Sequence, residues 1–216
     1  MYLRELITIG YQTKFGIFIV KGETVMFNAK TDKKTALIFA DGCEEVEALT
    51  TYDILYRAGI PCTKVSINAD EFVKSSHEVI IKCDTTIDKV NFDEYDMIIL
   101  PGGMPGTPNL RSCDKLCKEI ITFAGFGKGI AAICAAPSVL AELGILIGVK
   151  ACCNPSKEAE IESEGAVVSR EQVVVSGNII TSRAMGTAIP FALAIVKYYL
   201  GDGAASYIKS NILYSG

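Results

Sequence analysis

The chain of 216 residues lacks the patterns that mark several large classes of protein. It has a single histidine, His77, and no Cys-x-x-Cys pair, so the common ligand patterns of a zinc site are missing. Its 21 basic residues are outnumbered by 25 acidic ones, and a net charge of -4 leaves no electrostatic footprint for nucleic acid. It also has no Gly-x-Gly-x-x-Gly loop and no phosphate-binding lysine motif, which argues against a nucleotide-binding protein.

Long hydrophobic runs are missing as well. No apolar run approaches the roughly 20 residues needed to cross a bilayer. The apolar run at 15–20 is too short for a signal peptide, and no small-residue cleavage site follows it. We therefore expect a cytoplasmic protein with no membrane partner. Its eight cysteines are then expected to be reduced rather than paired in disulfides. A zinc site on Cys113, Cys117 and the adjacent Cys152 and Cys153 is a weaker alternative, and we predict no metal.

From Thr35 onwards, the chain alternates between strand-like and helical segments. Residues 36–40 form a continuous apolar run, which is typical of a strand that is buried on both faces. We also expect a strand at 61–67 and buried strands at 96–101 and 129–133. Helical spacing is found at 44–58, at 109–125 with Asn109 as its cap, at 137–143, at 156–164 and at 186–200. We expect further strands at 77–83 and 149–153, antiparallel strands at 166–169, 172–175 and 178–181, and a short helix in 202–216. The alternation predicts an α/β protein with a mostly parallel sheet and helices on both faces.

The domain organisation follows from the same pattern. Residues 34–216 are predicted to form one α/β domain. Residues 1–33 are read as an extension of unclear structure that could hold a hairpin from 15–20 and 24–27.

Cys134 lies where the apolar run at 129–133 meets the helix that follows it. A side chain at such a junction projects from the end of the sheet, as in the nucleophile elbow of strand–nucleophile–helix hydrolases. The N-terminus of the next helix directs backbone N–H groups towards it, which predicts a thiol with a lowered pKa. The alternative is a small, buried and inert cysteine.

Three strand ends are expected to meet at one edge of the sheet, where sites in parallel sheets lie. The first strand end leads into the helix that carries Glu47 on its inner face, where a charged side chain is not expected without a functional reason. The second carries Gly102 and Gly103, whose N–H groups could receive an oxyanion, and the third carries Cys134 with the N–H of Ala135 behind it. A carboxyl buried near a thiolate is pushed towards its protonated form and can donate a hydrogen bond to sulfur.

The chain resembles the ThiJ/PfpI superfamily, in the branch that contains the Parkinson-disease protein and its bacterial relatives. Four motifs carry the resemblance in order: FADGCEEVEAL at 39–49, LPGGM at 100–104, AAICAAP at 131–137 and TSRAMGTA at 181–188. The resemblance implies a flavodoxin-like three-layer α/β/α sandwich and a homodimer. It also implies that Cys134 is the nucleophile, Glu47 its protonated partner, and Gly103 and Ala135 the oxyanion donors. Arg57 and Arg183 match family arginines with a structural or interfacial role.

Two departures from the family pattern bear on function. Many members have a histidine where this chain has Asn154, and protease-like members have one where it has Ala135. His77 lies on an edge segment and is expected to be exposed, so a Cys–His dyad and peptidase chemistry are not indicated. Asn154 can still orient a substrate carbonyl, although it cannot act as a base.

These features predict a cofactor-independent enzyme acting on small reactive carbonyls, with an aldehyde or ketoaldehyde such as methylglyoxal, or its adducts, as substrate. The expected reaction is of the glyoxalase III or protein deglycase type. The alternative is an oxidative-stress sensor or redox-regulated chaperone that works through oxidation of Cys134. In that case Cys43 or Cys153, which are expected on loops near the site, could trap a sulfenate as a disulfide.

Overall fold

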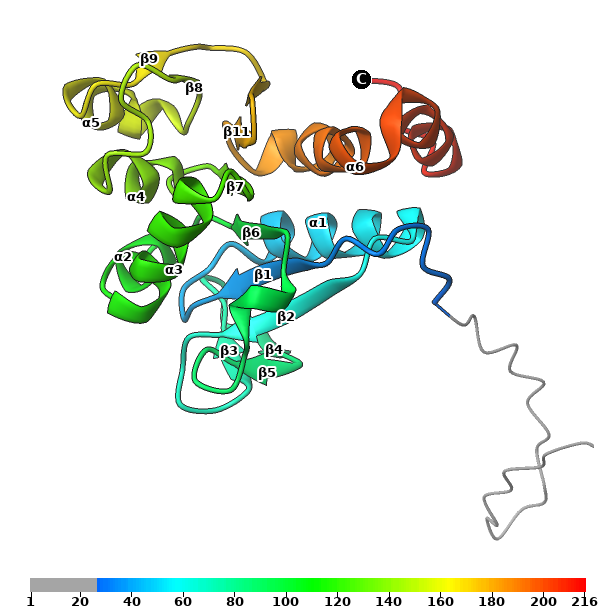
Figure 1. Ribbon diagram of the computed structural model, residues 1–216, viewed down its shortest axis with the longest axis horizontal. Helices are drawn as coiled ribbons and strands as arrows, with labels where there is room; N and C mark the ends of the chain where they lie inside the picture. Colours follow the sequence, from blue (N-terminus) through cyan, green and yellow to red (C-terminus); the bar gives the residue numbers. More distant parts are fainter. Residues whose placement is uncertain (1–26) are drawn as a thin grey trace, which may run out of the picture.

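The computed structural model describes residues 27–216, and within them seven strands form a central sheet in the order β10-β11-β7-β6-β1-β2-β5 (Figure 1). All neighbouring strands are parallel except β10 and β11, which pair in antiparallel fashion. The mostly parallel sheet predicted from the alternating pattern is therefore confirmed. The strands are β1 (Thr35–Phe39), β2 (Cys62–Ser66), β5 (Thr85–Thr86), β6 (Met97–Leu100), β7 (Gly129–Ile133), β10 (Val173–Ser176) and β11 (Ile179–Ser182).

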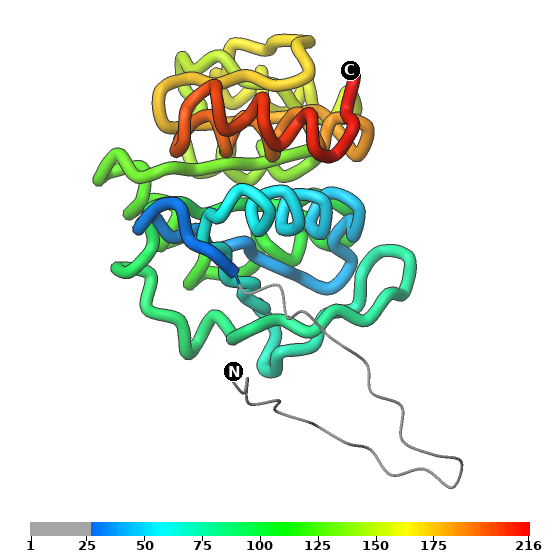
Figure 2. Tube along the Cα trace, turned by 90° about the vertical axis from the view of Figure 1, so that its right-hand side faces the viewer, coloured from blue at the N-terminus to red at the C-terminus, as the bar shows by residue number. Residues whose placement is uncertain are grey.

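Helices cover both faces of the sheet. The helices α1 (Glu45–Ala58) and α6 (Ala188–Asn211) lie side by side on one face, as Figures 1 and 2 show. The other face carries α2 (Gly106–Arg111), α3 (Asp114–Gly125) and α4 (Pro137–Glu142), with α5 (Glu158–Ser163) packed beside α4. This arrangement is the three-layer α/β/α sandwich that the resemblance implied.

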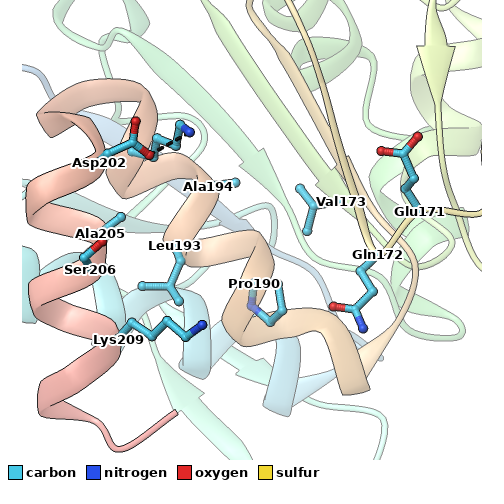
Figure 3. A pocket seen from close by; sticks show the side chains of 11 residues that line it. Glu171, Gln172, Val173, Pro190, Leu193, Ala194, Asp202, Ala205, Ser206 and Lys209 are labelled. Carbon is cyan, nitrogen blue, oxygen red and sulfur yellow. Dashed lines mark ion pairs between the residues drawn. The ribbon is translucent and has the colours of Figure 1, made fainter. Parts of the chain in front are cut away.

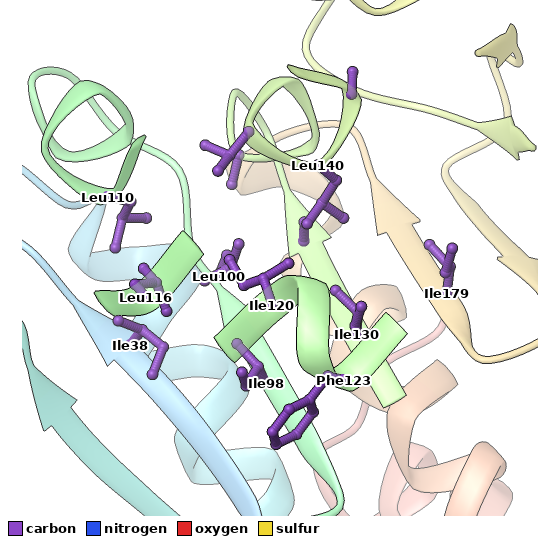
Figure 4. Close-up of a cluster of buried hydrophobic side chains, with 14 of the residues drawn as sticks. Ile38, Ile98, Leu100, Leu110, Leu116, Ile120, Phe123, Ile130, Leu140 and Ile179 are labelled. Carbon is purple, nitrogen blue, oxygen red and sulfur yellow. The ribbon is translucent and has the colours of Figure 1, made fainter. Parts of the chain in front are cut away.

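The two faces hold separate hydrophobic cores, and the strands divide their side chains between them. In β1, Ala36 and Ile38 point to the core under α2, α3 and α4, while Leu37 and Phe39 point to the core under α1 and α6. Figure 4 shows the first core, where Phe123 of α3 packs over the sheet. Because successive side chains of a strand alternate between faces, a strand between two helical layers must be apolar throughout. This is why the buried strands could be recognised as continuous apolar runs.

Two small sheets lie outside the main one, and both correct a sequence-based expectation. The strands β3 (Phe72–Lys74) and β4 (Ile80–Lys82) form an antiparallel hairpin, so His77 lies in its turn rather than in a strand at 77–83. The strand β9 (Val167–Val168) pairs in parallel with β8 (Lys150–Ala151), so the prediction of an antiparallel strand at 166–169 is wrong. Strands of two residues are too short to show a period.

Two helix predictions are corrected too. Asn109 is not a cap, because it lies within α2 and its Nδ2 donates to the carbonyl of Asp41 at 2.8 Å, and Cys113 precedes α3 instead. The helix expected at 186–200 continues as α6 to Asn211, across a kink at Gly201, where φ is 79°. A glycine tolerates this left-handed conformation, and the predicted helix of the tail follows directly after it. Three 3₁₀ turns complete the fold: η1 (Phe92–Glu94), η2 (Pro155–Lys157) and η3 (Met185–Thr187).

The expected hairpin from 15–20 and 24–27 lies outside the described residues, apart from its last residue, and the division at residue 33 stays a prediction. Phe27 packs its ring 5.1 Å from that of Tyr56 on α1. Among the helices of residues 27–216, none combines the length and the apolar character that a membrane span requires. The cytoplasmic location likewise stays a prediction.

Candidate active site

Cys134 forms a tight elbow at the end of β7. Its φ of 65° is in the left-handed region, which is uncommon for a residue with a side chain and costs backbone strain. Two backbone hydrogen bonds hold it there: its N–H donates to the carbonyl of Ser182 at 3.0 Å, and its carbonyl accepts from the N–H of Asn154 at 2.7 Å. The elbow therefore rests on the end of β11 on one side and on the segment before η2 on the other.

Glu47 lies on the buried face of α1 with 1% of its surface exposed. Its Oε2 accepts the N–H of Gly102 at 2.8 Å, whereas its Oε1 has no partner among the described residues. Burial raises the pKa of the Glu47 carboxyl to about 7, the charge of Glu44 adds to the rise, and the Gly102 N–H and the Cys134 side chain oppose it. A carboxyl in this position keeps its proton up to neutral pH.

The pKa of Cys134 differs from the lowered value that the sequence predicted. Burial, together with the negative charge of Glu47, raises the pKa of the thiol to about 12, and this outweighs the Ala135 N–H and the Asn154 side chain, which lower it. Because α4 begins only at Pro137 and has six residues, its dipole is short. The expectation that a helix N-terminus alone lowers the pKa of this thiol is therefore wrong.

The thiol and the carboxyl titrate as a pair. The contribution of Glu47 to the pKa of Cys134 acts only while the carboxyl is ionised, and it disappears when the carboxyl holds the proton. When the pair carries one negative charge, the proton lies on one group or the other. The Gly102 N–H favours charge on the carboxylate, and the Ala135 N–H and Asn154 favour charge on sulfur. The geometry thus allows a thiolate beside a neutral carboxyl. Ionising both groups at once would cost free energy, because two like charges would lie close together in a buried place.

Gly102 is a site residue that the sequence did not single out from its neighbour. A Cβ at Gly102 would lie 2.6 Å from the Cβ of Cys134 and 2.9 Å from Oε2 of Glu47, so only glycine fits between the two. Gly103, the predicted oxyanion donor, has φ 101° and packs instead against the backbone of 42–44. Its role as a donor stays a prediction. The Pro-Gly-Gly run signalled close packing, but it could not tell which glycine faces the cysteine.

Asn154 joins the site as its sequence position indicated. Its Nδ2 lies 3.7 Å from Sγ of Cys134. Its Oδ1 is turned away and accepts from Ser156. The structure thus brings Cys134, Glu47, Ala135 and Asn154 together around one sulfur atom.

His77 is part of a different cluster. Its Nδ1 lies 2.8 Å from Oε1 of Glu45 and 4.0 Å from Oε2 of Glu44, and its side chain is 68% exposed, as expected. The ligating atoms of these three residues lie within 4.8 Å of one another, which makes them the one group in residues 27–216 whose spacing could suit a metal ion. Hydrogen bonds to Ser76 and between His77 and Glu45 already account for the arrangement.

The remaining predicted residues lie as follows. Arg57 pairs with Asp53 at 2.6 Å on an exposed face of α1, and Arg183 lies 3.5 Å from Glu158. Cys43 and Cys153 are both fully buried. Their proposed roles stay predictions.

A hollow of about 430 Å³ lies between α6 and β10 (Figure 3). Its lining includes Val173 and Leu193 and the charged side chains of Lys197, Asp202 and Lys209. None of the residues around the sulfur of Cys134 lines it. The chemistry of the elbow therefore does not extend into this hollow.

Comparison with known proteins matches residues 33–198 to the family described as DJ-1/PfpI. Protein dj-1beta of Drosophila melanogaster is 37% identical over 182 residues, which are 84% of this chain and 97% of that protein. The glutathione-independent glyoxalase DJR-1.2 of Caenorhabditis elegans is 34% identical over 167 residues, covering 76% of this chain and 88% of the relative. The structure of oxidized Toxoplasma gondii DJ-1 superimposes with a TM-score of 0.81 at 34% identity, covering 85% of this chain and all of that one. These matches confirm the resemblance that the four motifs indicated.

Proposed function

The chain belongs to the DJ-1/PfpI family, and from this premise and the geometry at Cys134 we propose that it is a cofactor-independent, cysteine-dependent enzyme acting on small reactive carbonyls. The substrates that fit are methylglyoxal, glyoxal and their early adducts on amines or thiols. One relative, from Caenorhabditis elegans, is named a glutathione-independent glyoxalase. The absence of a histidine at the elbow argues against a peptidase.

The reaction begins with addition of the Cys134 thiolate to the aldehyde carbon. A carbon–sulfur bond forms, and the carbonyl electron pair moves to oxygen. N–H donors at Ala135 and Gly103, with Asn154 beside the sulfur, receive the oxyanion of this hemithioacetal. Glu47, which carries the proton when sulfur is anionic, protonates that oxygen and becomes the base for the next step.

Glu47 then moves a proton from the former aldehyde carbon to the neighbouring carbonyl oxygen. The electron pair left behind forms the carbon–carbon double bond of an enediol. The enediol becomes a thioester when the hydroxyl on the sulfur-bearing carbon loses its proton and the adjacent carbon gains one, so one carbon is oxidised and the adjacent one is reduced without an external electron acceptor. Water cleaves the thioester, releasing lactate from methylglyoxal or glycolate from glyoxal and restoring the thiol. The overall change is the addition of one water molecule.

The observation that carries this proposal is the buried Glu47, whose pKa is raised to about 7 and whose Oε1 lacks a partner, beside a cysteine in a left-handed elbow. An acid of this pKa can give and take a proton at neutral pH.

Lactate formation from methylglyoxal tests the proposal. We expect wild-type protein to form lactate and Cys134→Ser to lose the activity by at least about 100-fold, because a serine hydroxyl is a far weaker nucleophile at neutral pH. Cys117→Ser is the matched control, since Cys117 is half-buried on α3 and its thiol donates to the carbonyl of Arg111. Activity that survives Cys134→Ser would refute the nucleophile.

A second candidate function is that of an oxidative-stress sensor or redox-regulated chaperone that works through oxidation of Cys134. It is favoured by the unpartnered Oε1 of Glu47, which in protonated form can donate to an oxygen on sulfur, and by the oxidized form of the Toxoplasma gondii relative. Mass spectrometry after mild peroxide distinguishes the two: selective gain of two oxygens at Cys134 with negligible lactate formation favours sensing.

A further inference from the structure

The Asn154 side chain is held at both ends. Its Oδ1 accepts the backbone N–H of Ser156 at 3.0 Å and the hydroxyl of Ser156 at 2.8 Å. Its Nδ2 lies 3.7 Å from Sγ of Cys134. The amide therefore spans the gap between an exposed serine in η2 and the sulfur of the elbow.

The chemistry of these contacts fixes which end of the amide faces the sulfur. An asparagine side chain offers an acceptor at one end and two donors at the other, and the two ends have nearly the same shape. If the amide turned over, its NH₂ group would face the N–H of Ser156, and two donors would oppose each other. The only arrangement that satisfies Ser156 places the N–H group of Asn154 against the sulfur.

We propose that Ser156 is a positioning residue, which holds the Asn154 amide so that it supplies a fixed hydrogen-bond donor to the negative charge that develops at Cys134. This inference rests on the proposed role of Cys134 as the reacting atom, although not on the identity of the carbonyl. The donor is neutral and does not titrate, so it acts in the same way at every pH at which the protein is folded. The pH dependence of the thiol then comes from Cys134 and Glu47 without a third ionising group on Asn154.

A simpler role for Asn154 is to cap η2, because its Oδ1 accepts from Ser156 as capping side chains do. The two roles differ in the chemical group that they require at the end of the amide that faces the sulfur. A cap needs only the acceptor, which aspartate supplies equally well, whereas a donor to sulfur needs the NH₂ group.

The first experiment follows the rate at which iodoacetamide alkylates Cys134 at pH 7, measured on its own peptide by mass spectrometry. We expect Ser156→Ala to slow alkylation about threefold, because the amide loses one of its two anchors and turns away from sulfur for part of the time. Ser156→Thr keeps the hydroxyl and should restore the rate. Ser163→Ala is the matched control, since Ser163 is an exposed serine near the end of α5 whose hydroxyl donates to the carbonyl of Glu160. An unchanged rate in Ser156→Ala, or a failure of Ser156→Thr to restore it, overturns the role of Ser156.

The second experiment changes the far end of the amide. Asn154→Asp keeps the cap but puts a negatively charged oxygen against sulfur, so we expect alkylation at least about tenfold slower, with its rise displaced to higher pH by about one unit or more. A wild-type rate in this variant would mean that Asn154 is a cap and nothing else. Because iodoacetamide needs no carbonyl chemistry, slow alkylation in both variants would support this inference even if the wild-type protein formed no lactate, an outcome that would contradict the proposed function alone.

Discussion

At the scale of single residues, the site depends on one proton shared by Cys134 and Glu47. Burial opposes ionisation of both groups, and it raises the pKa of each. Each of the two groups depends on the other. A single buried carboxyl would destabilise the folded protein, and a single buried thiol would be unreactive. Together they form a pair that can carry one negative charge and move it between oxygen and sulfur.

The raised pKa of Glu47 predicts a particular dependence of stability on pH. Since the folded-state pKa is about 7 and the ordinary value is 4.5, the proton bound to Glu47 stabilises the folded state fully below about pH 4.5, and this contribution is lost as pH rises through about 7. Across that window the unfolding free energy of the wild type should fall, relative to that of Glu47→Gln, by on the order of 3 kcal/mol. Denaturant titrations of both proteins at several pH values measure this difference. A difference that does not change with pH would mean that Glu47 is ionised throughout.

Most of these residues could be identified from the sequence, because their side chains are unusual for the positions that they occupy. Glu47 is an acid on the buried face of a helix, and Cys134 is a cysteine that lies at a strand-to-helix junction. The sequence could not supply the pKa of Cys134, because burial depends on what packs over the residue. It also could not show that Gly102, rather than Gly103, faces Cys134 and Glu47, because these neighbours come from distant segments, and it did not identify Ser156.

At the scale of elements, the site is assembled where β6, β7 and β11 end. The three strands are adjacent in the sheet and parallel, so their carboxyl ends lie at one edge. The sequence predicted that the ends of β1, β6 and β7 meet, because parallel strands end at the same edge of a sheet, but it did not predict that the end of β11 holds the elbow through Ser182. It could not predict β5, which has two residues, the parallel pairing of β9 with β8, or the break between α2 and α3 that follows Ser112.

The close approach of the β6 end to the elbow can be tested with Gly102→Ala. The added methyl group would lie 2.6 Å from the Cβ of Cys134, so the two chain segments must move apart. We expect alkylation of Cys134 to slow by about tenfold or more and the unfolding free energy to fall by about 1–3 kcal/mol. Gly125→Ala is the control, because a Cβ there meets nothing within 4 Å. Equal behaviour of the two variants would mean that the elbow tolerates displacement.

At the scale of the whole molecule, we infer from the family resemblance that two copies of the chain associate. Exposed apolar side chains lie on the N-terminal half of α1, where Val46 is 42% and Leu49 is 38% exposed, and on β4 and the residue before it, where Ile80 and Val79 are exposed. The hairpin is tied to the start of α1 by the N–H of Ser76, which donates to the carbonyl of Cys43. These side chains suit the centre of an interface better than contact with water.

Light scattering during gel filtration tests this inference. We expect wild-type protein to elute at twice the mass of one chain and Val46→Glu to elute at the mass of one chain, because a buried, unpaired carboxylate would oppose association. Ile121→Glu is the matched control: it is 51% exposed on α3, on the opposite side of the sheet, and should leave the mass unchanged. A monomeric wild type, or a Val46→Glu variant that stays dimeric, would exclude this surface.

The most direct test of the shared proton is the alkylation rate of Cys134 as a function of pH in the wild-type protein. If Cys134 and Glu47 share one proton, the rate rises with an apparent pKa near 7, where the pair loses its first proton and sulfur takes part of the charge. If the thiol instead keeps its proton while Glu47 ionises, the rate stays low across neutral pH and rises only towards pH 12. That second result would contradict the account, because it would leave Cys134 without a reactive form at neutral pH.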